Sequence, residues 1–256
     1  MKVISYNVNG IRAAMTKNLT GWLAKEKPDL LCLQEIKAQP GQFDAYLFEV
    51  EGYHCNWYPA QKKGYSGVAI LSKQKPDLVV EGIDHDLYDF EGRVLRADFG
   101  DTSFISLYLP SGTSGDERQN FKMEFCNYFY GYIENLLKTR PKLIISGDIN
   151  ICHHPIDIHD PIGNKKSSGF LPDEREWLGK FIDMGFVDSF RHMHPNDVKY
   201  SWWTQRFGPR IRQENKGWRI DYSLVSHALK DKIEEADYLN DAWHSDHCPV
   251  MVELAD

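Results

Sequence analysis

KLIISGDIN, residues 142–150, is an apolar run that ends in a carboxylate and an amide, and it decides the fold. The interior of a buried strand is apolar, so a polar side chain at its end must find a partner or a metal ion. Asp148 and Asn150 are two positions apart, and on an extended backbone both side chains face the same way. The stretch therefore predicts a buried strand that brings two polar groups to one edge of a sheet.

Four more motifs have a similar design, in which a short leading segment gives way to polar side chains. They are Tyr6-Asn7-Val8-Asn9-Gly10, Gln34-Glu35, Arg219-Ile220-Asp221-Tyr222 and Ser245-Asp246-His247. One such ending could be a turn cap, but the five motifs together supply three Asp, one Glu, three Asn and one His. That inventory suits a hard divalent cation and hydrolytic phosphate chemistry. We therefore expect one polar cluster at the mouth of a sheet. Its candidate metal-binding residues are Asn7, Glu35, Asp148, Asn150, Asp246 and His247.

The rest of the chain mixes strand and helix patterns. Strands are expected at 2–8, 30–33, 68–71, 78–80, 94–99, 104–109, 143–146 and 250–254. Helical spacing is found at 11–26, 117–138 and 173–184. Strand pairs with interspersed helices indicate an α/β fold in layers with two sheets, rather than one doubly wound sheet. No repeat or linker interrupts residues 1–256, so we expect a single domain.

Residues 148–172 are rich in His, Pro, Gly, Asn and Lys and carry no periodicity. A loop of this length inside a compact domain is usually functional.

Composition excludes several classes of protein. A chain with 42% hydrophobic and 13% aromatic residues is ordinary for a soluble globular protein. Its apolar runs are too short to span a membrane, and the N-terminus lacks the pattern of a signal peptide. Five cysteines without a CxxC pair argue against a disulfide framework or a zinc site. We therefore expect a reducing compartment, by default the cytoplasm.

The net charge is −7, which argues against a protein that coats polyanions generally, yet the charge is unevenly placed. Residues 199–219 hold one acid, Glu214, among the cations Lys199, Arg206, Arg210, Arg212, Lys216 and Arg219. Residues 231–246 are mainly acidic. A basic stripe on an acidic body can orient a polyanion, so we expect the stripe to contact one.

Each candidate also has a plain structural interpretation. Glu35 could cap the next helix, and Asp148 with Asn150 could form an Asx-turn that leaves a strand. His247 could be a structural histidine, although Asp221 offers a carboxylate that would orient its imidazole and favour the charged form. Tryptophans are usually core residues; we expect Trp203 in the core and Trp218 facing the site.

Taken together, the motifs are specific. They are YNVNGIRA (6–13), PDLLCLQEIKA (28–38), GYSGVAILSK (64–73), EGRVLRADF (91–99), LYLPSG (107–112), SGDINICHHPIDI (146–158), GNKKSSGFLPDER (163–175), GWRIDY (217–222) and SDHCP (245–249). With them the chain resembles, nearly end to end, the exonuclease III family of abasic-site endonucleases in the DNase I-like endonuclease/exonuclease/phosphatase superfamily. The resemblance implies a four-layer α/β sandwich of two packed mixed sheets flanked by helices.

The resemblance also implies roles for single residues. Glu35 and Asn7 would hold Mg²⁺, with Asp246 near enough to be a second carboxylate, and Mn²⁺ would substitute. Catalysis would fall to Asp148, which orients or deprotonates the attacking water, to Asn150 and Tyr108, which stabilise the pentacovalent phosphate, and to His247 paired with Asp221. The DNA backbone would be touched by Arg93, Asn164 and Lys165, with Ser167 in the same motif as a further candidate contact. Arg206 and Arg210 are expected to bind phosphate for a separate reason, because they belong to the basic stripe. A pocket for a flipped-out abasic sugar would be lined by Trp202, Trp218 and Ile220.

Two positions depart from the family pattern. Ser167 stands where the family usually has a second Asn in GNxKN, and Ser111 stands where an amide is common. Neither residue belongs to the catalytic set, but with these two departures the sequence does not determine the balance between endonuclease and 3′-exonuclease activity. The sequence also does not distinguish between one and two metal ions.

The sequence therefore predicts a magnesium-dependent DNA repair nuclease. It would be a monomer that cuts duplex DNA 5′ to abasic sites and trims blocked 3′ ends. Two rivals are a superfamily hydrolase that acts on a phospholipid or inositol phosphate, and a DNA-binding module that has lost catalysis. The first predicts a membrane-seeking loop or a signal peptide, and the second predicts the loss of at least one of Glu35, Asp148, Asp221 and His247. Neither feature is present in the sequence.

Overall fold

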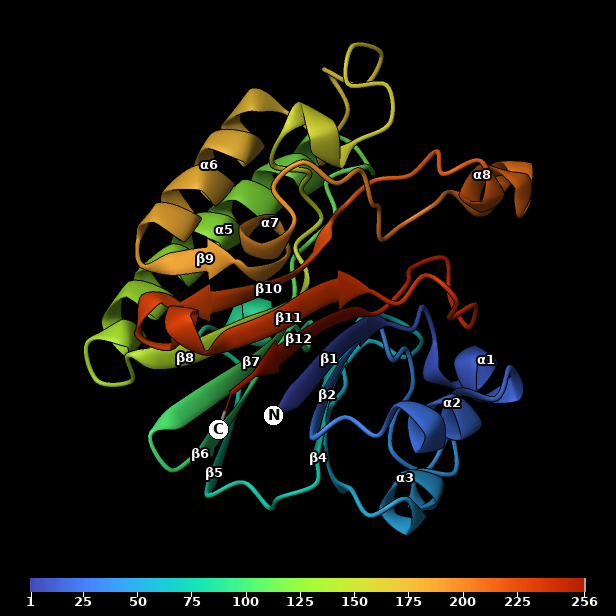
Figure 1. The fold of residues 1–256 in the computed structure, drawn as a ribbon, viewed down its shortest axis with the longest axis vertical. Coiled ribbons are helices and arrows are strands. Elements are labelled where there is room, and N and C mark those ends of the chain that lie inside the picture. Colours follow the sequence, from blue (N-terminus) through green and yellow to red (C-terminus); the bar gives the residue numbers. More distant parts are fainter. Residues whose placement is uncertain (256) are drawn as a thin grey trace.

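Two six-stranded sheets pack face to face in the computed structural model, which describes residues 1–255 (Figure 1). The first sheet has the order β11 (Ile233–Tyr238), β12 (Val250–Leu254), β1 (Lys2–Asn7), β2 (Leu30–Gln34), β4 (Val68–Ser72) and β3 (His54–Tyr58). The second has the order β5 (Leu78–Glu81), β6 (Val94–Phe99), β7 (Thr102–Tyr108), β8 (Lys142–Asp148), β10 (Asp221–Ser226) and β9 (Phe186–Asp188). Each sheet is mixed, because β1–β2 and β7–β8 are parallel and the remaining pairs are antiparallel.

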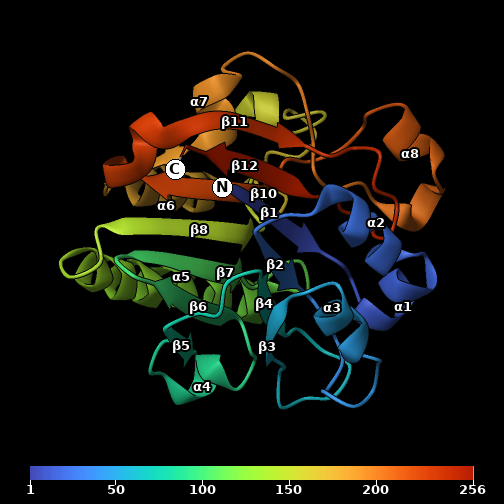
Figure 2. The same ribbon diagram turned by 60° about the horizontal axis from the view of Figure 1, so that its bottom comes forward.

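Helices cover the two outer faces, as Figures 1 and 2 show. The first sheet is covered by α1 (Ile11–Thr16), α2 (Leu19–Glu26) and α3 (Tyr46–Val50), and the second by α5 (Asp116–Leu137) and α6 (Pro172–Asp183). The other helical elements are α4 (Asp86–Asp89), η1 (Pro155–Asp157), α7 (Ser189–Met193), η2 (Gln205–Phe207), α8 (Arg210–Gln213) and η3 (His227–Lys232). Within residues 1–255, none of the helices has the length and apolar character needed to cross a membrane.

Three apolar layers hold this sandwich together, and the period of two in each strand produces them. In β1, Val3 faces the other sheet and packs in a cluster with Leu30, Phe104 and Ile144. Its neighbour Ile4 faces outward into the cluster under α1 to α3. Central strands such as β1, β2 and β4 are buried along almost their whole length because both of their faces are covered. The predicted pair of mixed sheets flanked by helices is confirmed.

Local predictions were less complete. The helical pattern at 11–26 is two helices, because Asn18 adopts a left-handed conformation (φ 67°) that breaks the run. Four strands, at 54–58, 186–188, 221–226 and 233–238, were not predicted. Three of them are short, polar or half exposed, and the buried strand at 221–226 has Asp221, Ser223 and Ser226 among its apolar residues. The predicted long loop at 148–172 holds only the single turn η1 before α6 begins.

The carboxyl ends of β1, β2, β7 and β8 lie at one end of the sandwich, and strand register sets which side chains meet there. Asp148 pairs with Tyr108 of β7 on one side and with Asp221 of β10 on the other. Gly147 allows this close pairing, because a Cβ at its position would lie 1.8 Å from the carbonyl oxygen of Leu107. This end of the sandwich therefore gathers the polar motifs of the sequence.

A buried ion network lies behind the same end. Arg219 is fully buried and donates from Nε to Asp157 Oδ1 at 2.7 Å and from Nη2 to Asp157 Oδ2 at 3.1 Å. Its Nη2 also lies 2.7 Å from Asp188 Oδ2, and Arg191 Nη2 lies 2.6 Å from Asp157 Oδ1. Although burial opposes ionisation, Arg219 and Arg191 hold the pKa of Asp157 well below its usual range. The network fixes the segment that leads into β10.

We expect Asp157→Asn to destabilise the protein by about 3–5 kcal/mol at pH 7, because it leaves buried cations without their carboxylate. The folded-state pKa is depressed, so the stabilisation is present above the unfolded pKa of about 4 and is lost as pH falls. Urea unfolding of parent and variant between pH 7 and pH 3 should show the difference shrinking toward acid. As a control, Asp101→Asn removes an exposed pair with Lys142 and should change stability little. Equal unfolding free energies for the parent and Asp157→Asn at pH 7 would contradict the assignment.

Candidate active site

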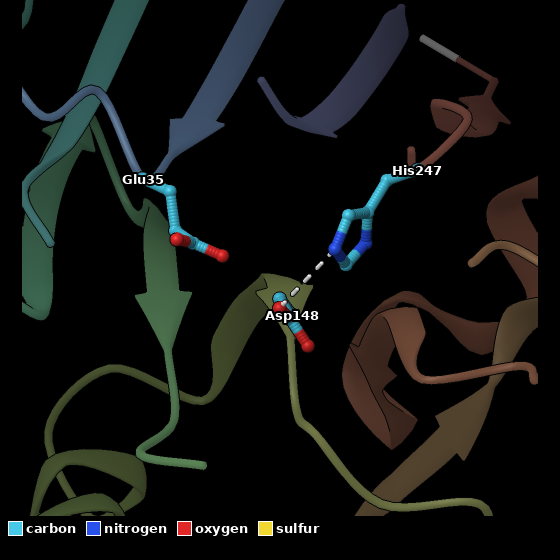
Figure 3. A group of neighbouring side chains, drawn as sticks. All are labelled: Glu35, Asp148 and His247. Atoms are coloured by element: carbon cyan, nitrogen blue, oxygen red, sulfur yellow. Dashed lines mark ion pairs between the residues drawn. The ribbon is translucent and has the colours of Figure 1, made fainter. Parts of the chain in front are cut away.

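Glu35, Asp148 and His247 converge from three distant parts of the chain (Figure 3). Glu35 follows β2, Asp148 ends β8, and His247 precedes β12. Each offers one ligand atom, and these atoms lie within 4.8 Å of one another. Two carboxylates and an imidazole at this spacing could hold a metal ion.

Asn7 lies between the two carboxylates. Its Nδ2 donates to Glu35 Oε1 at 2.8 Å and to Asp148 Oδ2 at 2.9 Å, while its Oδ1 accepts from the amide of Asn9. As placed here, Asn7 is a hydrogen-bond donor to both carboxylates. Lys37, whose Nζ lies 2.7 Å from Glu35 Oε2, neutralises the outer side of Glu35.

The two carboxylates have opposite titration behaviour. Burial opposes the ionisation of Glu35, but Lys37 and Asn7 outweigh it and hold the pKa of Glu35 below its usual value. For Asp148, burial and the nearby carboxylates Asp221 and Glu35 raise the pKa, more than His247 and Asn7 lower it. A cation between Glu35 and Asp148 would relieve this repulsion, so the donor set fits a divalent ion.

His247 is held by Asp221. The imidazole Nδ1 lies 2.8 Å from Asp221 Oδ2, and Nε2 points to Asp148 Oδ2 at 3.9 Å. Burial alone would lower the pKa of His247, but Asp221 and then Asp148 raise it to about 10. The imidazole is therefore a cation at neutral pH, aimed into the site.

Asp246, the neighbouring acid, is tied to the rim of the site. Its Oδ1 accepts from Asn9 Nδ2 at 2.9 Å, and its Oδ2 accepts from Trp202 Nε1 at 3.1 Å. Burial opposes its ionisation, but His247 and these two hydrogen bonds hold the pKa of Asp246 below its usual value.

Tyr108 and Asn150 complete the polar cluster. Asn150 donates from Nδ2 to the carbonyl oxygen of Leu109 at 2.8 Å, and its backbone amide donates to Asp148 Oδ1 at 2.9 Å. The second bond is the Asx-turn that was the plain alternative for this motif, so the turn and the site are built from the same residues. Tyr108 is almost fully buried and lines the cleft beside Asp148.

A cleft of about 620 Å³ opens over these residues, and its far wall is aromatic. Trp202 and Trp218 meet edge to face at 6.0 Å, and Ile220 lies with them in a small apolar cluster. Gly169 closes this wall, because a Cβ there would lie 2.9 Å from the Trp218 ring. The site therefore joins a charged floor to an apolar pocket.

The backbone at the site is strained. Asn9, Glu35, Lys37 and Asn150 all have positive φ, between 45° and 55°. Residues with side chains rarely adopt this conformation, and where they do the surrounding contacts must enforce it. At these positions the backbone turns sharply after a strand, and the turn directs the polar side chains toward the cleft.

The expected DNA-contacting residues have different positions. Ser167 lines the cleft and donates to Asn164 Oδ1 at 3.3 Å, whereas Lys165 is exposed. Arg206 and Arg210 are exposed, and Arg210 pairs with Glu214.

Arg93 is buried inside the protein. The side chain is 2% exposed, and its guanidinium donates to Glu91, to Tyr65 and to the carbonyl oxygen of Tyr108. The guanidinium is therefore engaged within the protein, and the expected contact of Arg93 with the DNA backbone stays a prediction.

The basic stripe at 199–219 is also less open than its sequence indicates. Lys199 pairs with Asp237, Lys216 with Glu214, and Arg219 with Asp157. Arg212 turns inward between two tryptophan rings. Arg206 and Arg210 are the exposed arginines of the stripe, whereas Trp203 lies in the core as predicted.

Sequence reasoning gave too little weight to four residues of the cleft. They are Asn9, Lys37, Ser168 and Gly169. Asn9 links Asp246 to Lys37, accepting from Lys37 Nζ at 2.5 Å. The available signals were the second Asn of the first motif and the Lys two positions after Glu35, because both motifs were expected to contribute to the polar cluster.

Comparisons with known proteins agree with this geometry. The model of the Endonuclease/Exonuclease/phosphatase family matches residues 4–247. An exodeoxyribonuclease of Bacillus subtilis is 44% identical over 252 residues, 98% of this chain and 98% of the relative. Among solved structures, an AP endonuclease from Archaeoglobus fulgidus is 30% identical, with a TM-score of 0.91 over 100% of both chains. A 3′ phosphatase from Neisseria, solved with a product DNA hairpin, is 28% identical with a TM-score of 0.91, again over 100% of both chains.

We expect the imidazole of His247 to stay protonated well above pH 6.5 in the metal-free protein, because Asp221 raises its pKa. In Asp221→Asn the largest effect that raises this pKa is lost, so the pKa of the ring should fall below that of the parent. A proton NMR titration of the His247 ring in the presence of a chelator measures this difference. Asp231→Asn, which changes an exposed acid, is the control and should leave the His247 titration as in the parent. A parent His247 that titrates near pH 6.5 would show that the pair is not formed.

Proposed function

The chain belongs to the exonuclease III/AP endonuclease branch of the Endonuclease/Exonuclease/phosphatase family, and we propose that it is a DNA repair nuclease. It hydrolyses the phosphodiester 5′ to an abasic site in duplex DNA, leaves a 3′-hydroxyl and trims blocked 3′ ends. The observation that carries this proposal is the cleft in which the Glu35–Asp148–His247 cluster adjoins the pocket of Trp202, Trp218 and Ile220.

Glu35 and Asp148 are the side chains best suited to hold a divalent metal, with Asn7 and Asp246 beside them. Mg²⁺ prefers oxygen ligands and needs only one or two protein carboxylates, and Mn²⁺ accepts the same set. When bound, the ion would supply positive charge next to the scissile phosphate. Lys37 keeps Glu35 ionised, which keeps that carboxylate ready for a cation.

The other polar residues divide the work on the phosphate. Asp148, with its raised pKa, accepts the proton of the attacking water. His247, held as a cation by Asp221, and the Asn150 amide donate to the phosphate oxygens as charge builds up. Tyr108 donates from the same side.

Selection of the abasic site comes from the aromatic wall. A bare deoxyribose fits an apolar pocket that a nucleotide with its base cannot enter, and a site without a base is the least costly to flip out. Exposed Arg206, Arg210 and Lys165, together with Asn164 and Ser167, bind phosphates along the strand.

Incision of a duplex with one abasic analogue tests the proposal. We expect a cut 5′ to the analogue that needs Mg²⁺ or Mn²⁺ and stops in excess chelator. Glu35→Gln should raise the Mg²⁺ concentration required far more than it weakens DNA binding, because it removes one carboxylate charge. Asp148→Asn should lower the single-turnover rate by at least about 10²–10³-fold.

Two outcomes would reject parts of this proposal. Full activity in excess chelator removes the metal, and an uncut abasic duplex under all metal conditions removes the endonuclease. Asp148→Asn, purified in parallel, is the control for a contaminating nuclease.

Trp218→Ala should weaken discrimination between abasic and intact duplex while metal dependence and the melting temperature stay near those of the parent. The reason is that selection rests on the shape of the pocket, and Trp218 is half-buried rather than core. Cleavage of both substrates is measured alongside thermal unfolding. Trp203→Phe, a change at a core indole, is the matched comparison for a purely structural effect. If Trp218→Ala loses much stability but discriminates as the parent does, the pocket assignment fails.

A further inference from the structure

Main-chain carbonyls of three candidate catalytic residues are each bonded to a buried or part-buried cation. The carbonyl oxygen of Tyr108 accepts from Arg93 Nη1 at 2.9 Å, and that of Asn150 accepts from Lys122 Nζ at 2.9 Å. The carbonyl oxygen of His247 lies 3.5 Å from Arg212 Nη1. Tyr108 ends β7, whereas Asn150 and His247 lie in two different loops, so the repetition is not a property of one element.

Arg212 holds its loop at several points. Its guanidinium donates to the carbonyl oxygens of Ala242 at 2.6 Å, Asn240 at 2.9 Å and Ser245 at 3.3 Å, in addition to His247. The guanidinium also lies between two indoles, 4.5 Å from the Trp203 ring centroid and 4.3 Å from that of Trp243. It therefore fastens residues 240–247, the loop that carries Asp246 and His247, to the protein core.

Lys122 makes a similar contact, with the main-chain carbonyl oxygen of Asn150. It is fully buried on α5 and lies 2.5 Å from Glu174 Oε1 at the start of α6. Glu174 Oε2 in turn accepts the amides of Gly169 at 2.6 Å and Leu171 at 2.9 Å. One buried ion pair thus ties Asn150 to the Gly169 segment that supports Trp218.

Arg93 is the third cation. It is buried beneath Tyr108, with its guanidinium carbon 4.6 Å from the centroid of the Tyr108 ring as well as bonded to the Tyr108 carbonyl. Its charge is balanced by Glu91 Oε2 at 2.5 Å. The cation therefore contacts both the backbone and the side chain of the same residue.

We propose that Arg93, Lys122 and Arg212 are positioning residues that fix Tyr108, Asn150 and the Asp246–His247 loop by binding their main-chain carbonyls. A loop is normally mobile, whereas phosphoryl-transfer catalysis depends on groups held in place. A cation that binds several carbonyls of a loop replaces the ladder of hydrogen bonds that the loop lacks. The proposal rests on the proposed nuclease function for its effect on rate, but not for the anchoring itself.

The sequence alone favours another role for Arg212, a phosphate contact in the basic stripe. The two roles predict different measurements. A phosphate contact sets duplex affinity and contributes about one unit to the slope of log affinity against log salt. An anchor leaves both nearly unchanged and acts on the chemical step.

Arg212→Met is the decisive variant, because Met fills much of the space between the two indoles but donates no hydrogen bond. We expect the single-turnover incision rate at saturating enzyme and Mg²⁺ to fall about 10²-fold, the cost of a displacement of about 1 Å in a catalytic group. Affinity for uncut duplex and its salt slope should stay close to those of the parent. Amide hydrogen exchange in residues 240–247 should be faster, in the absence of DNA and metal.

Arg140→Met is the matched control. Arg140 also binds main-chain carbonyls, those of Gly100 at 2.9 Å and Thr102 at 3.2 Å, but at the start of β7, away from the cleft. It should lose thermal stability without a change in the incision rate per folded molecule. Arg212→Lys keeps the charge but not the flat fork of donors, so its rate should lie between those of the parent and Arg212→Met.

If Arg212→Met does not fold, Arg212→Lys and the paired variant Lys122→Met/Glu174→Gln carry the test. The paired variant removes both charges of one buried ion pair, so it leaves no buried charge unpaired. Slower incision with unchanged affinity supports the anchors. An unchanged rate in both, or a loss confined to affinity and salt slope, overturns them. If the parent itself does not incise DNA, the proposed function falls, and the exchange rates of residues 240–247 still decide the anchoring.

Discussion

Three carboxylates lie close together at one end of the sandwich, and the groups around them offset their mutual repulsion. Asp148 pairs in register with Asp221 in its own sheet and lies next to Glu35 from the other sheet. Burial, and after it the charges of Asp221 and Glu35, raise the pKa of Asp148. Asn7, Lys37 and His247 offset part of the repulsion. What remains is an affinity for positive charge, which is the basis for placing a divalent cation there.

The architecture is what lets such a cluster exist at all. Two mixed sheets bring the carboxyl ends of β1, β2, β7 and β8 to the same end of the sandwich, where the cleft opens. The strained turns after β2 and β8 then aim Glu35 and Asn150 inward. The strained backbone and the buried charges are confined to this end of the sandwich, and the packing of the apolar core offsets their unfavourable free energy.

Few cations of this acidic chain are left unpaired on the surface of the 199–219 segment. Most cations of the 199–219 segment are paired internally, and Arg212 and Arg219 point into the protein. A polyanion would therefore meet few unpaired surface cations there, because Arg206 is exposed but the exposed Arg210 already pairs with Glu214. The buried or part-buried cations Arg93, Lys122 and Arg212 have a different role, because they bind the main-chain carbonyls of the segments that carry the reacting groups. This division explains how a chain with a net charge of −7 can still be built to act on DNA.

Sequence by itself determined the layered α/β fold and the polar motifs at the strand ends. These features are local, since each depends on period-two apolar patterning or on a motif whose residues are adjacent in the chain. Only the tertiary structure decided that Arg93 and Arg212 turn inward, that Asn7 bridges two carboxylates, and that Asn9 and Lys37 join the cleft. A cation has the same letter in the sequence whether it meets solvent or a buried carbonyl. Its direction is set by partners distant in the chain, such as the four carbonyls around Arg212, which no short window of sequence contains.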